Sequence, residues 1–213
     1  MKKENIKQLR EYQRMLYVID MVNGFTKFGA LADPYIMHTV AEQIKLIEKF
    51  KKENQGVVFV KDCHEKNAIE FKTFPEHCIV GTSEADLIDE LKEYEASSIV
   101  YQKNSTSNIF APSAMKDLGK IKNLRQVVGV GCCTDICVLN FLIPLKNYFN
   151  QLNLDIDVFA VKSAIETYHI PDVHDREYYN KIAYDLMKQA GIIVVQDFEE
   201  LEQKELILER RGK

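Results

Sequence analysis

Apolar residues along the chain follow two alternating patterns, which predict strands and helices in turn. Short apolar runs that end in polar residues are typical of buried strands, and longer segments with apolar residues every three or four positions are typical of amphipathic helices. The runs predicted as strands are MLYVI (15–19), GVVFV (56–60), SSIVY (97–101), QVVGVG (126–131), DVFAV (157–161) and IIVVQ (192–196). The segments predicted as helices are residues 35–52, 84–94, 136–149 and 174–190.

The alternation of these elements indicates the fold class. Fully apolar strands separated by helices are typical of a parallel sheet that is covered on both faces. We therefore predict an α/β protein, a three-layer α/β/α sandwich with a mostly parallel central sheet. The 213 residues suffice for a single domain. Its core is expected at about 15–196, after a short N-terminal extension and before a C-terminal tail that forms a short amphipathic helix or frays.

Composition excludes several classes of protein. Apolar residues make up 46% of the chain and charged residues 28%, as in ordinary globular proteins. The net charge is -4 and no basic stripe is visible, so no nucleic-acid partner is expected. No apolar run is long enough to span a bilayer, so no membrane partner is expected either. The charged N-terminus lacks the apolar stretch of a secretory signal, which predicts a cytoplasmic protein.

Polar residues with chemical potential follow four of the predicted strands. Asp20 follows the first strand, Asp62 and His64 follow the second, and Lys103 follows the third. The fourth is followed by GCCTDIC, which contains Cys137. Ligands of open α/β sheets bind beyond the carboxyl ends of the strands. These side chains are therefore expected to meet at one edge of the sheet.

Cys137 is the candidate nucleophile among five cysteines, an odd number that does not suggest a disulfide framework. Thr134 or Asp135 can cap the helix that follows, which would place Cys137 in its first turn. There the helix dipole favours the thiolate, and free N–H groups can hold an oxyanion. A lone cysteine is more often a buried structural residue, but the nearby acid, lysine and helix start favour the catalytic interpretation. The adjacent Cys132 and Cys133 sit at the strand end and are less persuasive nucleophiles.

A cysteine nucleophile needs a base, and Asp20 is the best candidate. No histidine occupies a strand end near Cys137, and His169 and His174 are interpreted as cap or turn residues. Partial burial would raise the pKa of Asp20 toward a useful range, and Lys103 would offset its charge. Taken singly, Asp20 could be a turn residue and Lys103 a solvated surface lysine. Together with Cys137 they favour a catalytic group.

Two histidines and two carboxylates form a candidate metal site. Asp62 and His64 share one side of an extended chain, and Glu70 and His77 follow in a polar loop. Such a set suits zinc, iron or manganese. Its spacing matches no common structural zinc motif, and the alternative is a pair of ordinary loop histidines.

The order of these motifs resembles a known family from about residue 15 to about residue 196. DMVNGF with Asp20, DCH at 62–64, FPEHCIVGT at 74–82, Lys103 and GCCTDICV at 131–138 are similar to the nicotinamidase branch of the isochorismatase-like cysteine hydrolase superfamily. The resemblance assigns a catalytic triad and a metal site. The triad is Asp20, Lys103 and Cys137; the ligands are Asp62, His64 and His77, with Glu70 at the place of a further ligand in some members.

The resemblance also implies the rest of the site. A non-proline cis peptide is expected between Cys132 and Cys133, with the backbone N–H groups of Cys133 and Cys137 forming an oxyanion hole. Phe25 and Phe74 occupy the places of aromatic residues that stack on the substrate ring. One divalent metal ion is implied, with zinc as the first expectation and iron or manganese as alternatives. Relatives commonly self-associate, so a homo-oligomer is expected.

The implied reaction is hydrolysis of a small amide. Nicotinamide would become nicotinate and ammonia through a thioester on Cys137, while the metal ion binds the pyridine nitrogen. The chain departs from the pattern at Thr106, where some nicotinamidases have an aromatic residue, and it has no tryptophan.

Three alternatives stay open. A sister amidase would act on another small amide, a carbamoyl or a ureido compound, although such relatives generally lack the aspartate-histidine-histidine set. A non-catalytic binding protein of the same fold is disfavoured by the intact triad. A thiol redox protein is disfavoured because adjacent cysteines are a poor match to a CxxC motif.

Overall fold

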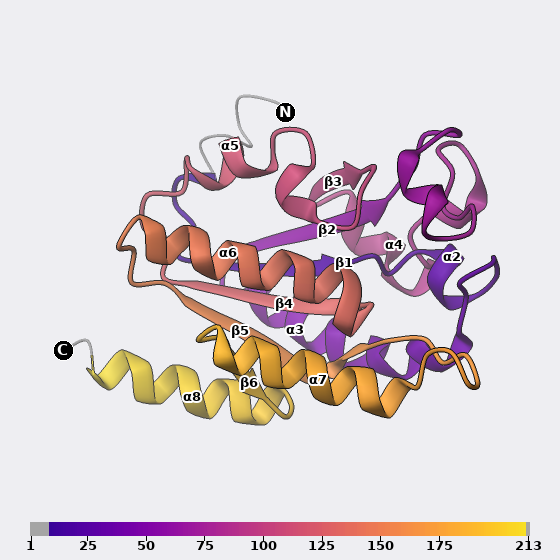
Figure 1. Cartoon of the computed structure of the whole chain (residues 1–213). Coiled ribbons are helices and arrows are strands. Elements are labelled where there is room, and N and C mark those ends of the chain that lie inside the picture. The colour runs from indigo at the N-terminus through magenta and orange to yellow at the C-terminus, as the bar shows by residue number, and fades with distance from the viewer. Residues whose placement is uncertain (1–8, 212–213) are drawn as a thin grey trace.

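Six parallel strands form one sheet in a computed structural model that describes residues 9–211 (Figure 1). The strands are β1 (Arg14–Ile19), β2 (Gly56–Asp62), β3 (Ile99–Lys103), β4 (Gln126–Cys132), β5 (Asp157–Glu166) and β6 (Ile193–Val195). Each predicted run contributes a strand, and their order across the sheet is β3-β2-β1-β4-β5-β6. The predicted α/β fold is confirmed, and the sheet is parallel throughout.

Helices cover both faces of the sheet. The α-helices are α2 (Asn23–Thr26), α3 (Val40–Lys52), α4 (Asp89–Glu95), α5 (Ala114–Leu118), α6 (Leu139–Gln151), α7 (Arg176–Gln189) and α8 (Phe198–Arg211). Short helical turns are η1 (Pro34–Thr39), η2 (Ile69–Lys72), η3 (Ser83–Ala85), η4 (Asn108–Phe110) and η5 (Thr134–Val138). In the view of Figure 1, α6 and α7 lie side by side in front of the sheet and α3 lies behind it. α8 contacts α3, the edge strand β6 and its neighbour β5.

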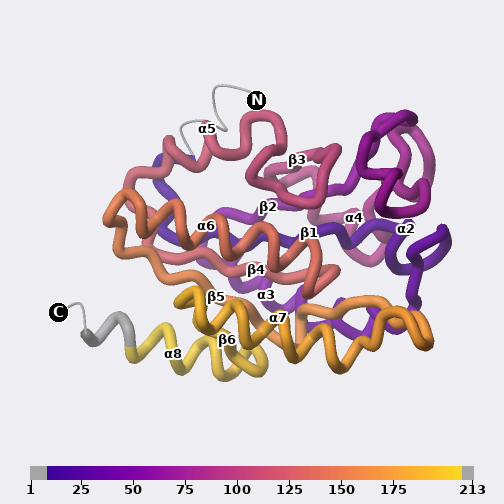
Figure 2. The backbone as a smooth tube through the Cα atoms, in the orientation of Figure 1, coloured from indigo at the N-terminus to yellow at the C-terminus, as the bar shows by residue number. Residues whose placement is uncertain are grey.

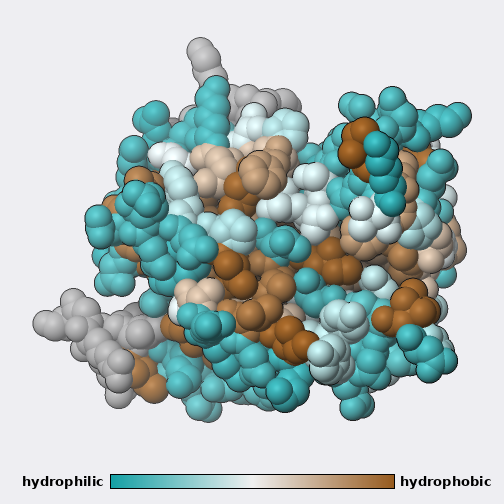
Figure 3. All heavy atoms as spheres, viewed as in Figure 1, coloured by the Kyte–Doolittle hydropathy of each residue, from teal (hydrophilic) through white to brown (hydrophobic). Residues whose placement is uncertain are grey.

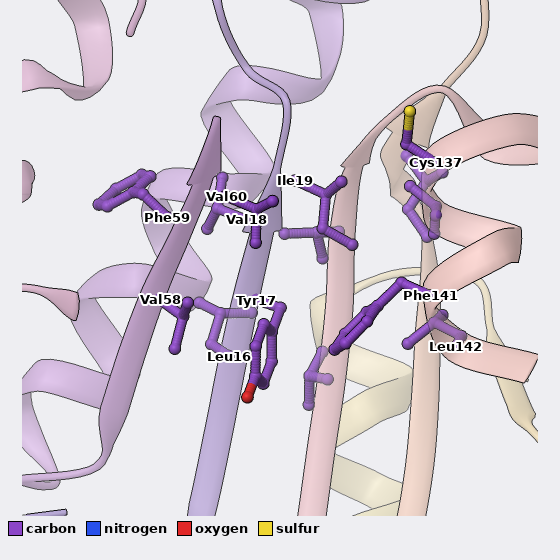
Figure 4. Close-up of a cluster of buried hydrophobic side chains, with 14 of the residues drawn as sticks. Leu16, Tyr17, Val18, Ile19, Val58, Phe59, Val60, Cys137, Phe141 and Leu142 are labelled. Atoms are coloured by element: carbon purple, nitrogen blue, oxygen red, sulfur yellow. The ribbon is translucent and has the colours of Figure 1, made fainter. Parts of the chain in front are cut away.

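Apolar side chains between these layers form the core. On α3, Leu46, Ile47 and Phe50 are fully buried on the stripe that faces the sheet. On the other face the ring of Phe141 from α6 lies 4.7 Å from that of Tyr17 on β1 (Figure 4). Burial of each large apolar side chain stabilises the fold by roughly 1.5–3 kcal/mol. Figure 3 shows hydrophobic residues gathered in the middle of the front face, where α6 and α7 cover the sheet.

Some elements begin or end away from their predicted bounds, and tertiary contacts explain two of the shifts. The helix predicted from residue 84 starts only at Asp89, because residues 86–88 run beside the chain after β1: Asn23 N–H donates to the Asp86 carbonyl (3.0 Å) and Ile88 N–H to that of Met21 (3.1 Å). The third strand runs on to Lys103, which pairs with Asp62 of β2.

Two further bounds differ in the C-terminal half of the chain. β5 continues past the predicted end at residue 161 to Glu166, across a shift in register opposite Gly129 and Gly131 of β4. α7 begins at Arg176 because the Asp175 side chain caps it, accepting from the N–H of Tyr178 at 2.8 Å. The C-terminal tail is a helix, α8, which decides between the two alternatives for it. Part of the N-terminal extension, residues 1–8, lies outside the described residues.

The ends of the described chain lie away from the carboxyl edge of the sheet. Figure 2 shows the described chain starting and ending on the left, while the β1 arrow in Figure 1 points to the right. Among residues 9–211, no helix has the length and apolar character needed to cross a membrane. The strand order reverses direction between β1 and β4, and such a switch point is where open α/β sheets bind ligands.

We expect Gly131→Ala to lower the free energy of unfolding by about 3 kcal/mol or more. Gly131 has φ +113, and a Cβ there would lie 2.0 Å from the carbonyl oxygen of Ile19. The matched control is Gly119→Ala, whose Cβ would lie 3.5 Å from the nearest atom with φ at -64. Urea unfolding of both variants measures the difference, and the control should change by less than about 1 kcal/mol. Equal effects of the two substitutions would contradict the close approach of β1 and β4.

Candidate active site

The carboxyl ends of β1 to β4 bring the predicted polar residues together. Asp20 directly follows β1, Asp62 ends β2 and Lys103 ends β3. Cys137 lies on η5, the π-helical turn that links β4 to α6. All four side chains are buried, with exposed fractions of 5% or less. Figure 4 shows Cys137 at the end of the packed cluster formed by β1 and α6.

Lys103 contacts each of the other three residues. Its Nζ lies 2.9 Å from Asp20 Oδ2, 2.9 Å from Asp62 Oδ1 and 3.7 Å from Cys137 Sγ. Burial alone would lower the pKa of Lys103, but the two carboxylates outweigh it and raise that pKa well above its ordinary value. A buried ammonium ion between two carboxylates therefore stays charged and holds both acids in place.

The backbone at Asp20 turns sharply. Its φ of 52 lies in the left-handed region, which costs a non-glycine residue of order 1 kcal/mol or more. Neighbouring strands hold this conformation: the Asp20 N–H donates to the carbonyl of Val60 (2.9 Å), and its carbonyl accepts from the Cys132 thiol (3.1 Å). The strained turn thereby fixes the Asp20 carboxylate beside Lys103.

Burial raises the pKa of both the Asp20 carboxyl group and the Cys137 thiol. Burial raises the pKa of Asp20 to about 6, although Lys103 and a hydrogen bond from Cys137 pull it down. Burial also raises the pKa of the Cys137 thiol well above its ordinary value, and the charge of Lys103 offsets only part of this effect. At neutral pH the site therefore holds a thiol beside a carboxylate, the pairing that a general base needs.

Two predictions about the start of the following helix are wrong. The residue before η5 is Cys133, and no side chain caps that turn. Thr134 Oγ1 has no hydrogen-bond partner, and the Asp135 carboxylate contacts Thr167 and His174 instead. Cys137 does lie in the helical turn η5 that leads into α6, but burial raises the pKa of its thiol, so a favoured thiolate is not found. The expected cis peptide between Cys132 and Cys133 is present.

Asp62, His64 and His77 offer three metal-ligand atoms within 4.8 Å of one another. Nδ1 of His64 donates to Asn104 Oδ1 at 3.3 Å, and Nδ1 of His77 donates to the carbonyl of Pro75 at 2.8 Å. With Nδ1 donating, each ring can present the lone pair of Nε2 to a metal ion. In metal sites, a hydrogen bond of this kind from the other ring nitrogen orients each histidine ligand.

The three ligand atoms converge as acceptors. The Nε2 atoms of His64 and His77 lie 3.1 and 3.2 Å from Asp62 Oδ2, and His64 Nε2 is buried with no hydrogen-bond partner. A divalent cation would satisfy all three atoms, so the donor set fits a metal ion. Burial alone would raise the pKa of Asp62, but the charge of Lys103 lowers it, so this ligand is ionised.

Glu70 does not belong to the group of converging metal-ligand atoms formed by Asp62, His64 and His77. Both of its carboxylate oxygens accept hydrogen bonds from Thr106, one from the backbone N–H at 3.0 Å and one from the hydroxyl. Thr106 is the residue at which the sequence departs from the aromatic pattern of some nicotinamidases. Thr106 thus holds the Glu70 carboxylate against the loop after β3 by hydrogen bonds.

A narrow pocket of about 20 Å³ lies against the thiol and the metal group. Its volume is below the usual range for small-molecule sites, so only a small ligand is expected to reach the thiol. Both predicted aromatic residues line it. The lining residues are Phe25, Leu31, Asp62, Glu70, Phe74, His77, Cys133, Ile136, Cys137 and Tyr168.

Sequence reasoning missed three aromatic or apolar members of this region and Tyr168. Phe71 lies 5.1 Å from the ring of His64 and 5.6 Å from that of His77, and Leu31 and Ile136 line the pocket. Tyr168 follows the fifth strand, so the inspection of strand ends that located Lys103 would have found it had the end of that strand been placed correctly.

The comparisons with known proteins agree with this geometry. The Isochorismatase domain matches residues 14–197. The chain belongs to the isochorismatase family. Nicotinamidase 1 of Arabidopsis thaliana is 27% identical to it in an alignment of 206 residues that covers 84% of each chain. This likeness supports the nicotinamidase branch of the superfamily.

Solved isochorismatase-family folds resemble the structure closely. N-carbamoylsarcosine amidase from Thermoplasma acidophilum superposes with a TM-score of 0.71 at 25% identity, covering 86% of this chain and 96% of that one. A pyrazinamidase of Pyrococcus horikoshii in complex with zinc gives 0.65 at 23% identity, covering 86% and 99%. The matched lengths show that the fold is shared over nearly the whole of these enzymes.

We expect His77→Ala to weaken zinc binding about a hundredfold or more, because it removes one of three converging donors. Glu70→Gln should weaken it by no more than about threefold, because the carboxylate is held by Thr106. Competition with a chromophoric chelator measures both affinities. If Glu70→Gln lost as much affinity as His77→Ala, Glu70 would be a fourth ligand.

Proposed function

We propose that this protein is a metal-containing cysteine amidohydrolase that converts nicotinamide to nicotinate and ammonia. One observation carries the proposal: Lys103 contacts Asp20, Asp62 and Cys137 at once. The nucleophile and its base therefore lie beside the metal group, and Cys137, Asp62 and His77 line one pocket together with aromatic and apolar side chains. The family match and the likeness to a plant nicotinamidase support the same chemistry.

Acylation begins with transfer of the Cys137 thiol proton to Asp20. The sulfur attacks the amide carbon, and the carbonyl oxygen becomes an oxyanion that the backbone N–H groups of Cys133 and Cys137 receive. As the carbon–nitrogen bond breaks, Asp20 returns the proton to the departing nitrogen, which leaves as ammonia. Lys103 stays charged throughout and offsets the negative charge that passes between the thiol and the acid.

Deacylation uses the same groups. Asp20 takes a proton from water as the water oxygen attacks the thioester carbon, and the carbon–sulfur bond then breaks. The proton returns to Cys137, and the acid product leaves and loses its remaining proton to solvent as nicotinate. A carboxyl group that both accepts and returns a proton needs a pKa near the working pH, as burial gives Asp20.

The metal group would orient the substrate ring. An ion held by Asp62, His64 and His77 would supply a Lewis-acid contact for the pyridine nitrogen. We propose zinc, because the pyrazinamidase of similar fold is in complex with zinc and because histidine and carboxylate donors suit it. Iron and manganese suit the same donors. Phe25 and Phe74, which line the pocket, would contact the faces or edges of the ring.

A second substrate class is favoured by one comparison. The similarity to N-carbamoylsarcosine amidase suggests hydrolysis of a carbamoyl compound by the same triad. Such a substrate has no ring nitrogen for the metal group and no ring for Phe25 and Phe74. The buried Asp62, His64 and His77 therefore favour nicotinamide. Cytoplasmic location and self-association stay predictions.

We expect the purified, zinc-loaded protein to release ammonia from nicotinamide. Cys137→Ala should reduce turnover at least about a thousandfold, because no other thiol contacts the Lys103 ammonium group among the described residues. Removal of the metal by a chelator should abolish turnover, and added zinc should restore it. Ammonia release from N-carbamoylsarcosine but not from nicotinamide would assign the second substrate class.

The pH profile of kcat/KM should show an acid limb near pH 6. Asp20 must be ionised to accept the thiol proton, and its pKa is raised to about 6, so the rate should fall about tenfold per pH unit below that value. Asp20→Asn should be inactive at every pH. A limb near pH 4, the ordinary range of a carboxyl group, would contradict the role given to the burial of Asp20.

A further inference from the structure

A second network of polar side chains lies beside the pocket and uses none of the triad or metal residues. It joins η5, which carries Cys137, to residues 167–175, the loop between β5 and α7. Asp135, two residues before Cys137, is its centre. Asp135 Oδ1 accepts from the hydroxyl of Thr167 at 2.7 Å, and Oδ2 accepts from Nε2 of His174 at 2.9 Å. One carboxylate thus binds the loop at both of its ends.

The imidazole of His174 is buried, with an exposed fraction of 7%. Its Nδ1 donates to the carbonyl of Tyr168 at 2.9 Å. Both ring nitrogens therefore face hydrogen-bond acceptors, the Tyr168 carbonyl and the Asp135 carboxylate. The ring lies between two tyrosine rings, with its centroid 4.2 Å from that of Tyr168 and 4.0 Å from that of Tyr179, and it stacks parallel to the latter with 4° between the planes.

Tyr168 connects this network to the pocket. Its side chain lines the pocket together with Cys133, Ile136 and Cys137. Its carbonyl and its ring both contact His174. The hydrogen bond between His174 and Asp135 therefore helps to fix the distance between the Tyr168 side chain and the Cys137 thiol.

We propose that Tyr168 sets the width of the pocket and so selects small amides, and that Asp135 and His174 are positioning residues that hold Tyr168 against the turn carrying Cys137. The inference rests on the proposed amide hydrolysis, because it concerns which substrates reach the same thiol. The three residues act on binding more than on bond breaking, since Asp20 and Lys103 do not contact this network.

The kinetic test separates KM from kcat. His174→Ala and Tyr168→Ala should raise KM for nicotinamide about tenfold while kcat stays within about threefold, which is the signature of lost substrate binding. Asp135→Ala should raise KM similarly. Asp135→Asn should restore KM to within about threefold of the unaltered protein, since an amide can pair with both Thr167 and a neutral His174. A fold that is merely damaged would lose active molecules and lower kcat at unchanged KM.

The matched control is Asp185→Asn, which removes a carboxylate on α7 that pairs with Lys181 at 3.1 Å and is 58% exposed. It should leave both kcat and KM unchanged. Thermal unfolding of every variant shows that the compared proteins are folded at the assay temperature.

A readout independent of turnover distinguishes failure of this inference from failure of the proposed function. Mass spectrometry follows alkylation of Cys137 by iodoacetamide and by the bulkier N-ethylmaleimide, with the partly exposed Cys63 as internal reference. His174→Ala and Tyr168→Ala should speed the maleimide reaction at Cys137 about tenfold more than the iodoacetamide reaction. That result without nicotinamide turnover would overturn the substrate and keep the positioning roles. Maleimide rates and KM within about twofold of the unaltered protein would overturn the inference.

Discussion

The buried ammonium group of Lys103 is the interaction on which the rest of the site depends. Two buried carboxylates, those of Asp20 and Asp62, each lie 2.9 Å from it. Without a cation between them, two buried negative charges would repel each other and lose the solvation that water gives. With it, Asp62 stays ionised and can face the two histidines, while Asp20 keeps a pKa near neutrality.

The parallel sheet makes this arrangement possible. Because every strand from β1 to β5 points the same way, the residue after each strand reaches the same edge, and the reversal of strand order between β1 and β4 leaves room there. Asp20, Asp62 and Lys103 stand at three adjacent strand ends, and the turn after the fourth presents Cys137. The chemistry of the site thus follows from where short apolar runs end along the chain.

Features that depend on neighbouring residues in the sequence could be predicted, whereas features that depend on contacts between distant residues could not. The strands and the residues after them are visible in local patterns, so the amino-acid sequence alone sufficed to choose Asp20, Asp62, Lys103 and Cys137. Tyr168 could not be chosen in this way, because residues 162–166 are partly polar and continue β5 only through pairing with a distorted β4.

Side-chain partners far along the chain were equally invisible. The pairing of Asp135 with His174 spans 39 residues, and that of Glu70 with Thr106 spans 36. The raised pKa of the Cys137 thiol depends on burial by the whole fold rather than on its place before a helix.

The most direct test of the account is to find which residue carries the acyl group during turnover. Zinc-loaded protein is mixed with nicotinamide and quenched with acid, and mass spectrometry locates any nicotinoyl group. The account predicts a nicotinoyl thioester on the peptide that contains Cys137. An acyl group on a different residue, or undiminished turnover by Cys137→Ser protein, would contradict it.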